Sequence, residues 1–470
     1  MVFEQFYLSC LAQASYLIGS EGIGAVVDPQ RDVDQYLEAA AQHGLRIAHV
    51  IETHLHADFV SGHSELAERT AAQIYLGEGS GATFAHSSVR DGDEIAFGKC
   101  RLRFLQTPGH TAESVCVLIT DLERATNSER RHASGPWAVL TGDTLFIGDV
   151  GRPDLSKSYR PEELAGLLYD SLHNKLLALP DDVAVYPAHG AGSMCGRNIS
   201  PDRSSTIGRE RQFNYALRPM TREQFVHMMT EDLPPRPEYF QRDVDLNRHG
   251  AVPLAELPRL RAIPGEETQR LQRAGATILD TRAGGTFCSG HIPGSVNIGL
   301  GGQFAAWAGT VVGLDQDLIL VAEDTRAVEE SQQRLARVGI ERLAGFVEGG
   351  VAGWVRTGLP LEQTCQISAQ ELQASRNEDG GSVIPVPSIL DVRRPAEWKQ
   401  GRIPGAVHIP LDDLRRRIAE LDGTRTVAVY CKSGYRSSIA CSLLQAAGFQ
   451  RVLNIQGGFD AWSGANLAVG

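Results

Sequence analysis

The sequence has no uninterrupted run of eighteen or more apolar residues, which a membrane-spanning helix needs. Its first residues, 1–6, contain no basic segment followed by an apolar core, so we expect no signal peptide. Positive charge is also scarce, because 45 lysines and arginines stand against 57 aspartates and glutamates, giving a net charge of −12. A negative surface repels polyanions and anionic lipid, so we expect neither a nucleic-acid nor a membrane partner.

Closely spaced cysteine pairs are absent as well. The eight cysteines are Cys10, Cys100, Cys116, Cys195, Cys288, Cys365, Cys431 and Cys441. Their wide spread over 470 residues is typical of reduced thiols and not of a disulfide framework. We therefore expect a cytoplasmic protein, and the length predicts about three domains.

Potential metal ligands follow a short apolar run at 47–51, which we predict to be a buried strand. The next stretch, 53–63, contains His54, His56 and Asp58 two residues apart. In an extended chain this spacing places the three side chains on one side. Imidazole and carboxylate are ligands for divalent metals, so the stretch indicates a metal site.

Three further segments, 107–111, 141–144 and 186–190, have the same design. Each follows an apolar run and ends in a candidate ligand beside a glycine or proline turn, namely His110, Asp143 and His189. A polar loop with incidental histidines would not be followed by three matching segments. Four strands would therefore deliver these groups to one edge of a fold.

The order of the four motifs resembles the metallo-β-lactamase superfamily, whose α/β fold is an αββα sandwich. Two-metal hydrolases of this superfamily, such as glyoxalase II, carry a histidine directly after the aspartate of the first motif, where this chain has Phe59. Phenylalanine has no lone pair, so we expect one metal. Among one-metal members, the resemblance is to persulfide dioxygenases, also called sulfur dioxygenases, and it implies one Fe(II) per chain, with zinc as the alternative.

The resemblance also assigns residues. The ligands would be the two-histidine, one-carboxylate set of non-haem Fe(II) oxygenases: His54, His110 and Asp143. Groups that orient these ligands or bind water would be His56, Asp58 and His189. Arg152 matches the family's arginine near the thiol substrate. Cys195 could also reach the metal face, although a structural role is an equal alternative.

Apolar periodicity predicts helices in the first part of the chain and then a linker near 250–258. No regular element is predicted between 230 and this linker, because prolines interrupt the pattern. The predicted helices cover 33–43, 60–70, 161–179, 207–217 and 222–229.

The remainder of the chain contains an internal repeat. Residues 278–282 match 389–393, and 290–296 match 401–407 at the same offset. The pattern, strand–Asp-x-Arg, then Gly-x-Ile-Pro-Gly, then Gly-Gly-x-x-x-Trp, resembles the rhodanese-like α/β fold. We predict three domains, which cover residues 1–258, 259–360 and 361–470.

Cys431 begins the most reactive segment of the last domain. It follows the predicted strand 427–430 and precedes a predicted helix at 439–447. A cysteine on a tight loop that opens a helix gains from backbone N–H groups and nearby cations, which favour the thiolate. The six-residue loop resembles that of sulfurtransferases, with Cys431 and Arg436 as catalytic groups. The residues expected to bind substrate there are Lys432, Ser433, Gly434 and Tyr435.

The first repeat has Ala322 opposite Cys431, so we expect that domain to be catalytically silent. The whole pattern resembles persulfide dioxygenase–rhodanese fusions. Such a protein would oxidise a low-molecular-weight thiol persulfide, such as glutathione persulfide, with O2 to sulfite, and would make or use thiosulfate at Cys431. Members of two other classes remain alternatives: a zinc-dependent thioesterase or lactonase, and a sulfur relay with a vestigial metal domain. We expect a homo-oligomer, either a dimer or a tetramer.

Overall fold

The fold is described from a computed structural model, which describes residues 1–123, 135–231, 233, 236–313, 316–377 and 387–470. The chain divides into two compact units. The first comprises residues 1–257 with 336–339, and the second comprises 258–335 with 340–470. Within the described ranges, no helix has both the length and the apolar character that a membrane crossing requires.

Two six-stranded sheets form the centre of the first unit. The first sheet has its strands in chain order: β1 (Val2–Leu8), β2 (Gln13–Ser20), β3 (Ile23–Val27), β4 (Arg46–Ile51), β5 (Gln73–Gly77) and β6 (Ser87–Val89). The second has the order β12-β11-β10-β9-β8-β7: β7 (Glu94–Phe97), β8 (Cys100–Gln106), β9 (Val115–Asp121), β10 (Ala138–Gly142), β11 (Ala184–Pro187) and β12 (Ser205–Thr206). Side chains such as Ile18, Phe104 and Leu140 form one apolar core from both sheets.

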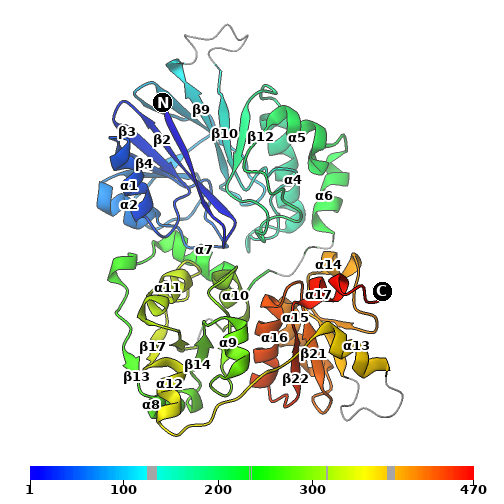
Figure 1. The fold of residues 1–470 in the computed structure, drawn as a ribbon. Helices are drawn as coiled ribbons and strands as arrows, with labels where there is room; N and C mark the ends of the chain where they lie inside the picture. The colour runs from blue at the N-terminus through cyan, green and yellow to red at the C-terminus, as the bar shows by residue number, and fades with distance from the viewer. Residues whose placement is uncertain (124–134, 232, 234–235, 314–315, 378–386) are drawn as a thin grey trace. The chain divides into compact units, whose positions relative to one another are not determined.

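Helices cover the outer faces of these sheets (Figure 1). On the first sheet lie α1 (Asp34–Gln42) and α2 (His63–Thr70). On the second lie α4 (Pro161–Ser171), α5 (Ile207–Phe213) and α6 (Arg222–Thr230). The predicted αββα sandwich is therefore confirmed.

The helices depart from the predictions in four places. A π-helical turn at Leu172–Leu176 follows α4, and a 3₁₀ turn at Tyr215–Leu217 follows α5, so both long predicted helices are divided. The helix predicted at 60–70 begins only at His63. The helix α7 (Tyr239–His249) lies where no element was predicted, and it contributes Asn247 to the site described below.

The second unit contains two parallel five-stranded sheets with equivalent strand orders, β13-β17-β16-β14-β15 and β18-β22-β21-β19-β20. We call residues 259–360 the first module and residues 361–470 the second module. The first module contains β13 (Ala262–Ile263), α8 (Gly265–Arg273), β14 (Thr277–Asp280), α9 (Gly284–Ser289), β15 (Val296–Asn297), α10 (Phe304–Val311), β16 (Leu318–Val321), α11 (Thr325–Ala336), β17 (Leu343–Val347) and α12 (Gly350–Arg356). The second contains β18 (Cys365–Ile367), α13 (Ala369–Asn377), β19 (Ser388–Asp391), α14 (Pro395–Lys399), β20 (Val407–His408), α15 (Leu411–Arg417), β21 (Val427–Tyr430), α16 (Tyr435–Ala446), β22 (Val452–Ile455) and α17 (Gly458–Gly464). The shared strand order gives the sequence repeat its structural basis.

Candidate metal centre and cysteine loop

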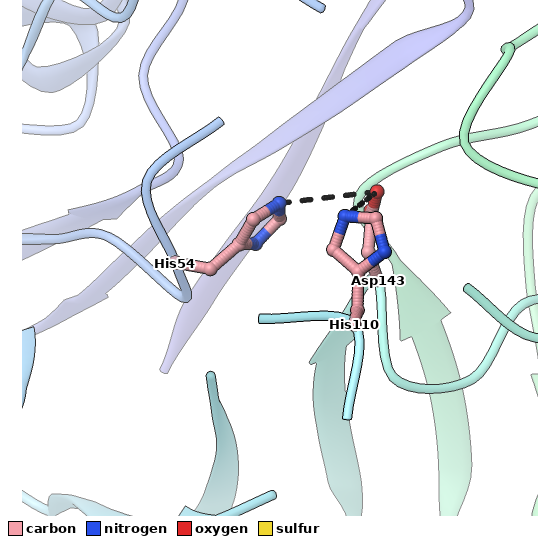
Figure 2. Close-up of side chains that lie close together, drawn as sticks. All are labelled: His54, His110 and Asp143. Atoms are coloured by element: carbon pink, nitrogen blue, oxygen red, sulfur yellow. Dashed lines mark ion pairs between the residues drawn. The ribbon is translucent and has the colours of Figure 1, made fainter. Parts of the chain in front are cut away.

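Three side chains from three strand ends meet inside the first unit (Figure 2). His54 follows β4, His110 follows β8 and Asp143 follows β10. Asp143 Oδ2 lies 3.4 Å from His110 Nε2 and 3.9 Å from His54 Nε2. All three side chains are buried, and no described protein group hydrogen-bonds to any of these three atoms. Buried polar atoms usually have a partner, so three unpaired donor atoms around one point fit a metal ion.

The charge states of the three groups also suit a metal. Burial and the neighbouring imidazole of His56 hold the pKa of His54 well below its usual value, and burial lowers the pKa of His110. Burial opposes ionisation of Asp143, but the imidazoles of His189, His54 and His110 together hold its pKa below the usual value. The site thus offers two neutral imidazoles and one carboxylate, which are the forms that bind metals.

Neighbouring groups orient both imidazoles. His54 Nδ1 lies 3.0 Å from Thr53 Oγ1, and this hydroxyl donates to Asp28 Oδ2 at 2.9 Å. Because the hydroxyl proton goes to Asp28, Thr53 Oγ1 can accept a hydrogen bond from His54 Nδ1–H. His110 Nδ1 lies 2.9 Å from the carbonyl oxygen of Arg152 and donates to it. In both rings the proton is held on Nδ1, which leaves Nε2 free for a metal.

His189 lies between two carboxylates. Its Nδ1 hydrogen-bonds to Asp143 Oδ1 at 2.7 Å, and its Nε2 lies 3.0 Å from Asp58 Oδ2. Burial disfavours the charged ring, but the carboxylates of Asp143 and Asp58 raise the pKa of His189 to about 10. The bond to Asp143 Oδ1 orients that carboxylate so that Oδ2 faces the two histidines.

The cysteine loop lies in the second module. Cys431 follows β21, its side chain is buried, and Gly434 donates its backbone N–H to Cys431 Sγ at 3.1 Å. Lys432 and Ser433 are exposed, and α16 begins at Tyr435. A sulfur atom that accepts an N–H bond at the start of a helix is placed in a field that favours negative charge.

Arg436 faces a carboxylate and not open solvent. Its two terminal nitrogens donate to Glu397 at 2.6 and 2.7 Å. This bidentate pair fixes the guanidinium beside the loop. Glu397 also offsets part of the positive charge of Arg436, which weakens the attraction of Arg436 for an anionic substrate.

The segment of the first module that corresponds to the cysteine loop has the same backbone geometry. Ala322 follows β16 as Cys431 follows β21. A Cβ on Gly350 would lie 3.1 Å from Ala322 O, and one on Gly458 would lie 2.4 Å from Cys431 O. The positive φ angles of these glycines, 58° and 57°, are likewise equivalent. The first module therefore keeps the loop's support but has a methyl group in place of the thiol.

Two family models match the chain. The metallo-beta-lactamase superfamily model matches residues 8–122, and the rhodanese-like domain model matches residues 264–357 and 368–465. The human protein named persulfide dioxygenase ETHE1, mitochondrial, is 31% identical over 247 residues, which are 51% of this chain and 84% of that protein. A sulfurtransferase from Allochromatium vinosum is 42% identical over 81 residues, which are 17% of this chain and 76% of that protein.

A solved structure matches across both units. A metallo-beta-lactamase from Staphylococcus aureus is 32% identical, with a TM-score of 0.64, and the match covers 73% of this chain and 98% of that one. The chain belongs to the persulfide dioxygenase–rhodanese fusions of the metallo-β-lactamase superfamily.

In this fusion protein, the His56 ring lies 4.1 Å from the His54 ring between centroids, but its Nε2 faces two other carboxylates and not the three candidate donor atoms. Residues 53–60 form bends and not a strand, so the expected alternation to one side does not hold. His56 Nε2 lies 3.1 Å from Asp28 Oδ1 and 3.3 Å from Glu52 Oε2. Burial opposes protonation, but these two carboxylates raise the pKa of His56 well above its usual value. His56 therefore forms a buried ion pair that anchors the loop.

Phe59 fills the space beside this ion pair. Its ring is buried and lies 4.4 Å from the His56 ring and 6.2 Å from the His189 ring, measured between centroids. The residue directly after Asp58 thus offers no lone pair to a metal.

Two residues near the metal centre, Cys195 and Arg152, were predicted to contact the substrate, and they lie in different surroundings. Cys195 is buried, and its Sγ lies within 4.8 Å of donor atoms of Asp58 and His189. Burial and the Asp58 carboxylate raise the pKa of Cys195 well above the usual value, so it is a neutral thiol. Arg152 is also buried, and its guanidinium pairs with Asp154 at 2.7 and 2.9 Å. The backbone carbonyl of Arg152 therefore orients His110, and its guanidinium is already paired with a carboxylate of the protein.

Asn247 is a site residue that the sequence did not reveal. Its Nδ2 donates to the carbonyl oxygens of His56 and Phe59, both at 2.8 Å. Its Oδ1 accepts from the backbone N–H of Ser61 at 2.7 Å. One buried amide therefore satisfies three backbone groups of the ligand-bearing loop, and it does so from α7.

Proposed function

We propose that the first unit is a non-haem Fe(II) persulfide dioxygenase. It would convert one thiol persulfide, one O2 and one water into one thiol, one sulfite and two protons. The observation that carries this proposal is the meeting of two neutral histidines and one carboxylate, whose facing atoms are buried and unpaired. That donor set leaves positions open for two reactants on iron, which would supply O2 activation when bound.

A cavity next to the ligand-bearing loop suits the thiol carrier. It has a volume of about 370 Å³, and Leu55, Ala57 and Thr111, which adjoin the histidines, help to line it. Lys157 also lines it and would attract a carboxylate of a carrier such as glutathione, while Arg248 is paired with Asp245 and Glu113 adds a negative charge. The chain's residues would thus hold the carrier while the outer sulfur reaches the metal centre.

Metal content tests the proposal. Protein purified without oxygen should contain about one iron per chain, and its removal by a chelator should abolish persulfide oxidation, because only a metal satisfies the three donors. Iron-free protein that oxidises persulfide at the parent rate would contradict the assignment.

A zinc-dependent hydrolase of the glyoxalase II type is the second candidate. One observation favours it: Asp58, His189 and Cys195 bring three further donor atoms within 4.8 Å of one another. Two zinc ions per chain together with thioester or lactone hydrolysis would support this candidate over the dioxygenase.

We further propose that Cys431 is a sulfur carrier. Its thiolate would take the sulfane sulfur of a donor as a Cys431 persulfide, and sulfite would attack the outer sulfur to leave as thiosulfate while the Cys431 thiolate is released. The N–H bond from Gly434 to Sγ supports this role. Mass spectrometry after incubation with thiosulfate should find one added sulfur atom on Cys431, and none in Cys431→Ser.

The unpaired state of all eight cysteines fits a reducing, cytoplasmic setting.

A further inference from the structure

A cavity of about 390 Å³ lies beside the cysteine loop, inside the second unit. Ser433, Gly434 and Tyr435 of the loop line one side of it. The opposite side comes from the first module, through Gly285 of α9 and Gly299 after β15. The silent module therefore shares a cavity with the reactive one.

Direct contacts hold the two modules together at this cavity, where α9 and α16 lie side by side (Figure 1). Asn297 Oδ1 accepts from Ser438 Oγ at 2.7 Å, and the Asn297 N–H donates to Ser442 Oγ at 2.9 Å. Tyr435 donates its hydroxyl to Gly299 O at 2.8 Å. Because these partners are residues of α16, the wall that the first module provides is fixed relative to the loop.

The chemistry of the lining selects a class of ligand. Among the described residues that form the cavity, none has a charged side chain, and amides and hydroxyls predominate. Gln366 and Gln456 hydrogen-bond to each other at 3.0 Å, and each keeps further amide capacity toward the cavity. Sulfite and thiosulfate are small anions, and these walls offer them no positively charged side chain to pair with. The uncharged peptide groups of a larger molecule, such as the amides of a thiol-bearing peptide, would satisfy the amides and hydroxyls of the walls instead.

We propose that this cavity is a binding subsite for the amide-bearing body of a low-molecular-weight thiol that exchanges sulfur with Cys431, and that the first module exists in part to form its wall. The inference rests on the proposed sulfur transfer at Cys431. In that step the carrier's thiolate attacks the outer sulfur of the Cys431 persulfide. A new S–S bond forms on the carrier, the bond to Cys431 Sγ breaks, and the electron pair leaves with the Cys431 thiolate, so no oxidant is needed.

Gly285 offers a direct test. It is exposed, lines the cavity, and a Cβ there would meet nothing within 4 Å, so Gly285→Phe fills the subsite without a clash at Cβ. Thiosulfate is the donor, and glutathione and cyanide are compared as acceptors. We expect the KM for glutathione to rise about tenfold or more, while the rate with cyanide stays within about twofold, because cyanide needs only the loop.

Two further variants keep the outcome clear. Gly464 on α17 is also exposed, has open space at its Cβ and does not line the cavity, so Gly464→Phe should leave both acceptors unchanged. Gln456→Leu keeps the side chain's size but removes its amide, and it should also raise the KM for glutathione alone. Equal loss with both acceptors, or an unchanged KM for glutathione in Gly285→Phe, would overturn the subsite. A wild-type protein that transfers no sulfur to cyanide would overturn the role of Cys431 itself.

Discussion

Thr53 links a candidate metal ligand to a buried carboxylate, and its removal gives a quantitative test of the metal centre. Its hydroxyl donates to Asp28 Oδ2 at 2.9 Å and accepts from His54 Nδ1, 3.0 Å away. Thr53→Val keeps the side chain's shape and removes both bonds. His54 could then place its proton on either ring nitrogen, and Nε2 would no longer be reserved for the metal.

The structure sets the size of the effect. Loss of a group that orients a metal ligand weakens metal binding by about 10- to 100-fold, which is about 1.4 to 2.7 kcal/mol. The variant also leaves Asp28 Oδ2 and His54 Nδ1 buried without their partner, and each such loss costs roughly 1–3 kcal/mol of stability. Metal-free Thr53→Val should therefore unfold at a lower temperature than the metal-free parent.

The assay is a competition titration of iron or zinc against a chelator, with the apparent affinity measured for each variant. Thr53→Ser should restore most of the affinity, because it keeps the hydroxyl. Ser15→Ala is the matched control: it removes another buried hydroxyl bond, 2.6 Å to Tyr36 Oη, which is not linked to a ligand. An unchanged affinity in Thr53→Val, or an equal loss in Ser15→Ala, would show that Thr53 does not orient His54 for a metal.

Three other substitutions test separate parts of the account. Phe59→His places a nitrogen donor beside Asp58, so under excess zinc the second-metal occupancy should rise and the dioxygenase rate should fall; unchanged stoichiometry would show that Phe59 does not exclude a second ion. Asn247→Ala removes the side chain that hydrogen-bonds to three backbone groups of the ligand-bearing loop. At about 1 kcal/mol per bond, the free energy of unfolding measured in denaturant titrations should fall by roughly 3 kcal/mol. A drop under 1 kcal/mol would contradict the proposed anchoring. Cys431→Ser should keep iron and persulfide-dependent O2 uptake while its products shift from thiosulfate to sulfite, and an unchanged thiosulfate yield would exclude Cys431 as the carrier.

The sandwich and the meeting of the candidate ligands could be predicted because each ligand directly follows an apolar strand. His54, His110 and Asp143 all have this local signal: His54 follows a strand of the first sheet, and His110 and Asp143 follow strands of the second, so the three meet where both sheets of the sandwich end. Asp28 has the same signal after β3, so the carboxylate that orients Thr53 was also within reach of the sequence.

Other features depend on contacts across long stretches of chain. Asn247 lies about two hundred residues from the loop it anchors, in a helix that follows a proline-rich segment, and one asparagine carries no motif. His56 does lie beside His54, with ring centroids 4.1 Å apart, but its buried ion pair with Asp28 and Glu52 carried no signal in the sequence. Which residue pairs with Arg436 was equally invisible, because Glu397 comes from a different helix.

We propose that the first unit oxidises a persulfide with O2 at a single iron. The most direct test of this proposal is O2 uptake by iron-loaded protein supplied with glutathione persulfide, with sulfite and thiosulfate measured together. We expect one O2 to be consumed for each persulfide sulfur oxidised, and no uptake by the zinc-loaded protein or by His110→Ala. Equal uptake by the iron- and zinc-loaded forms, or persulfide loss without O2 consumption, would contradict it.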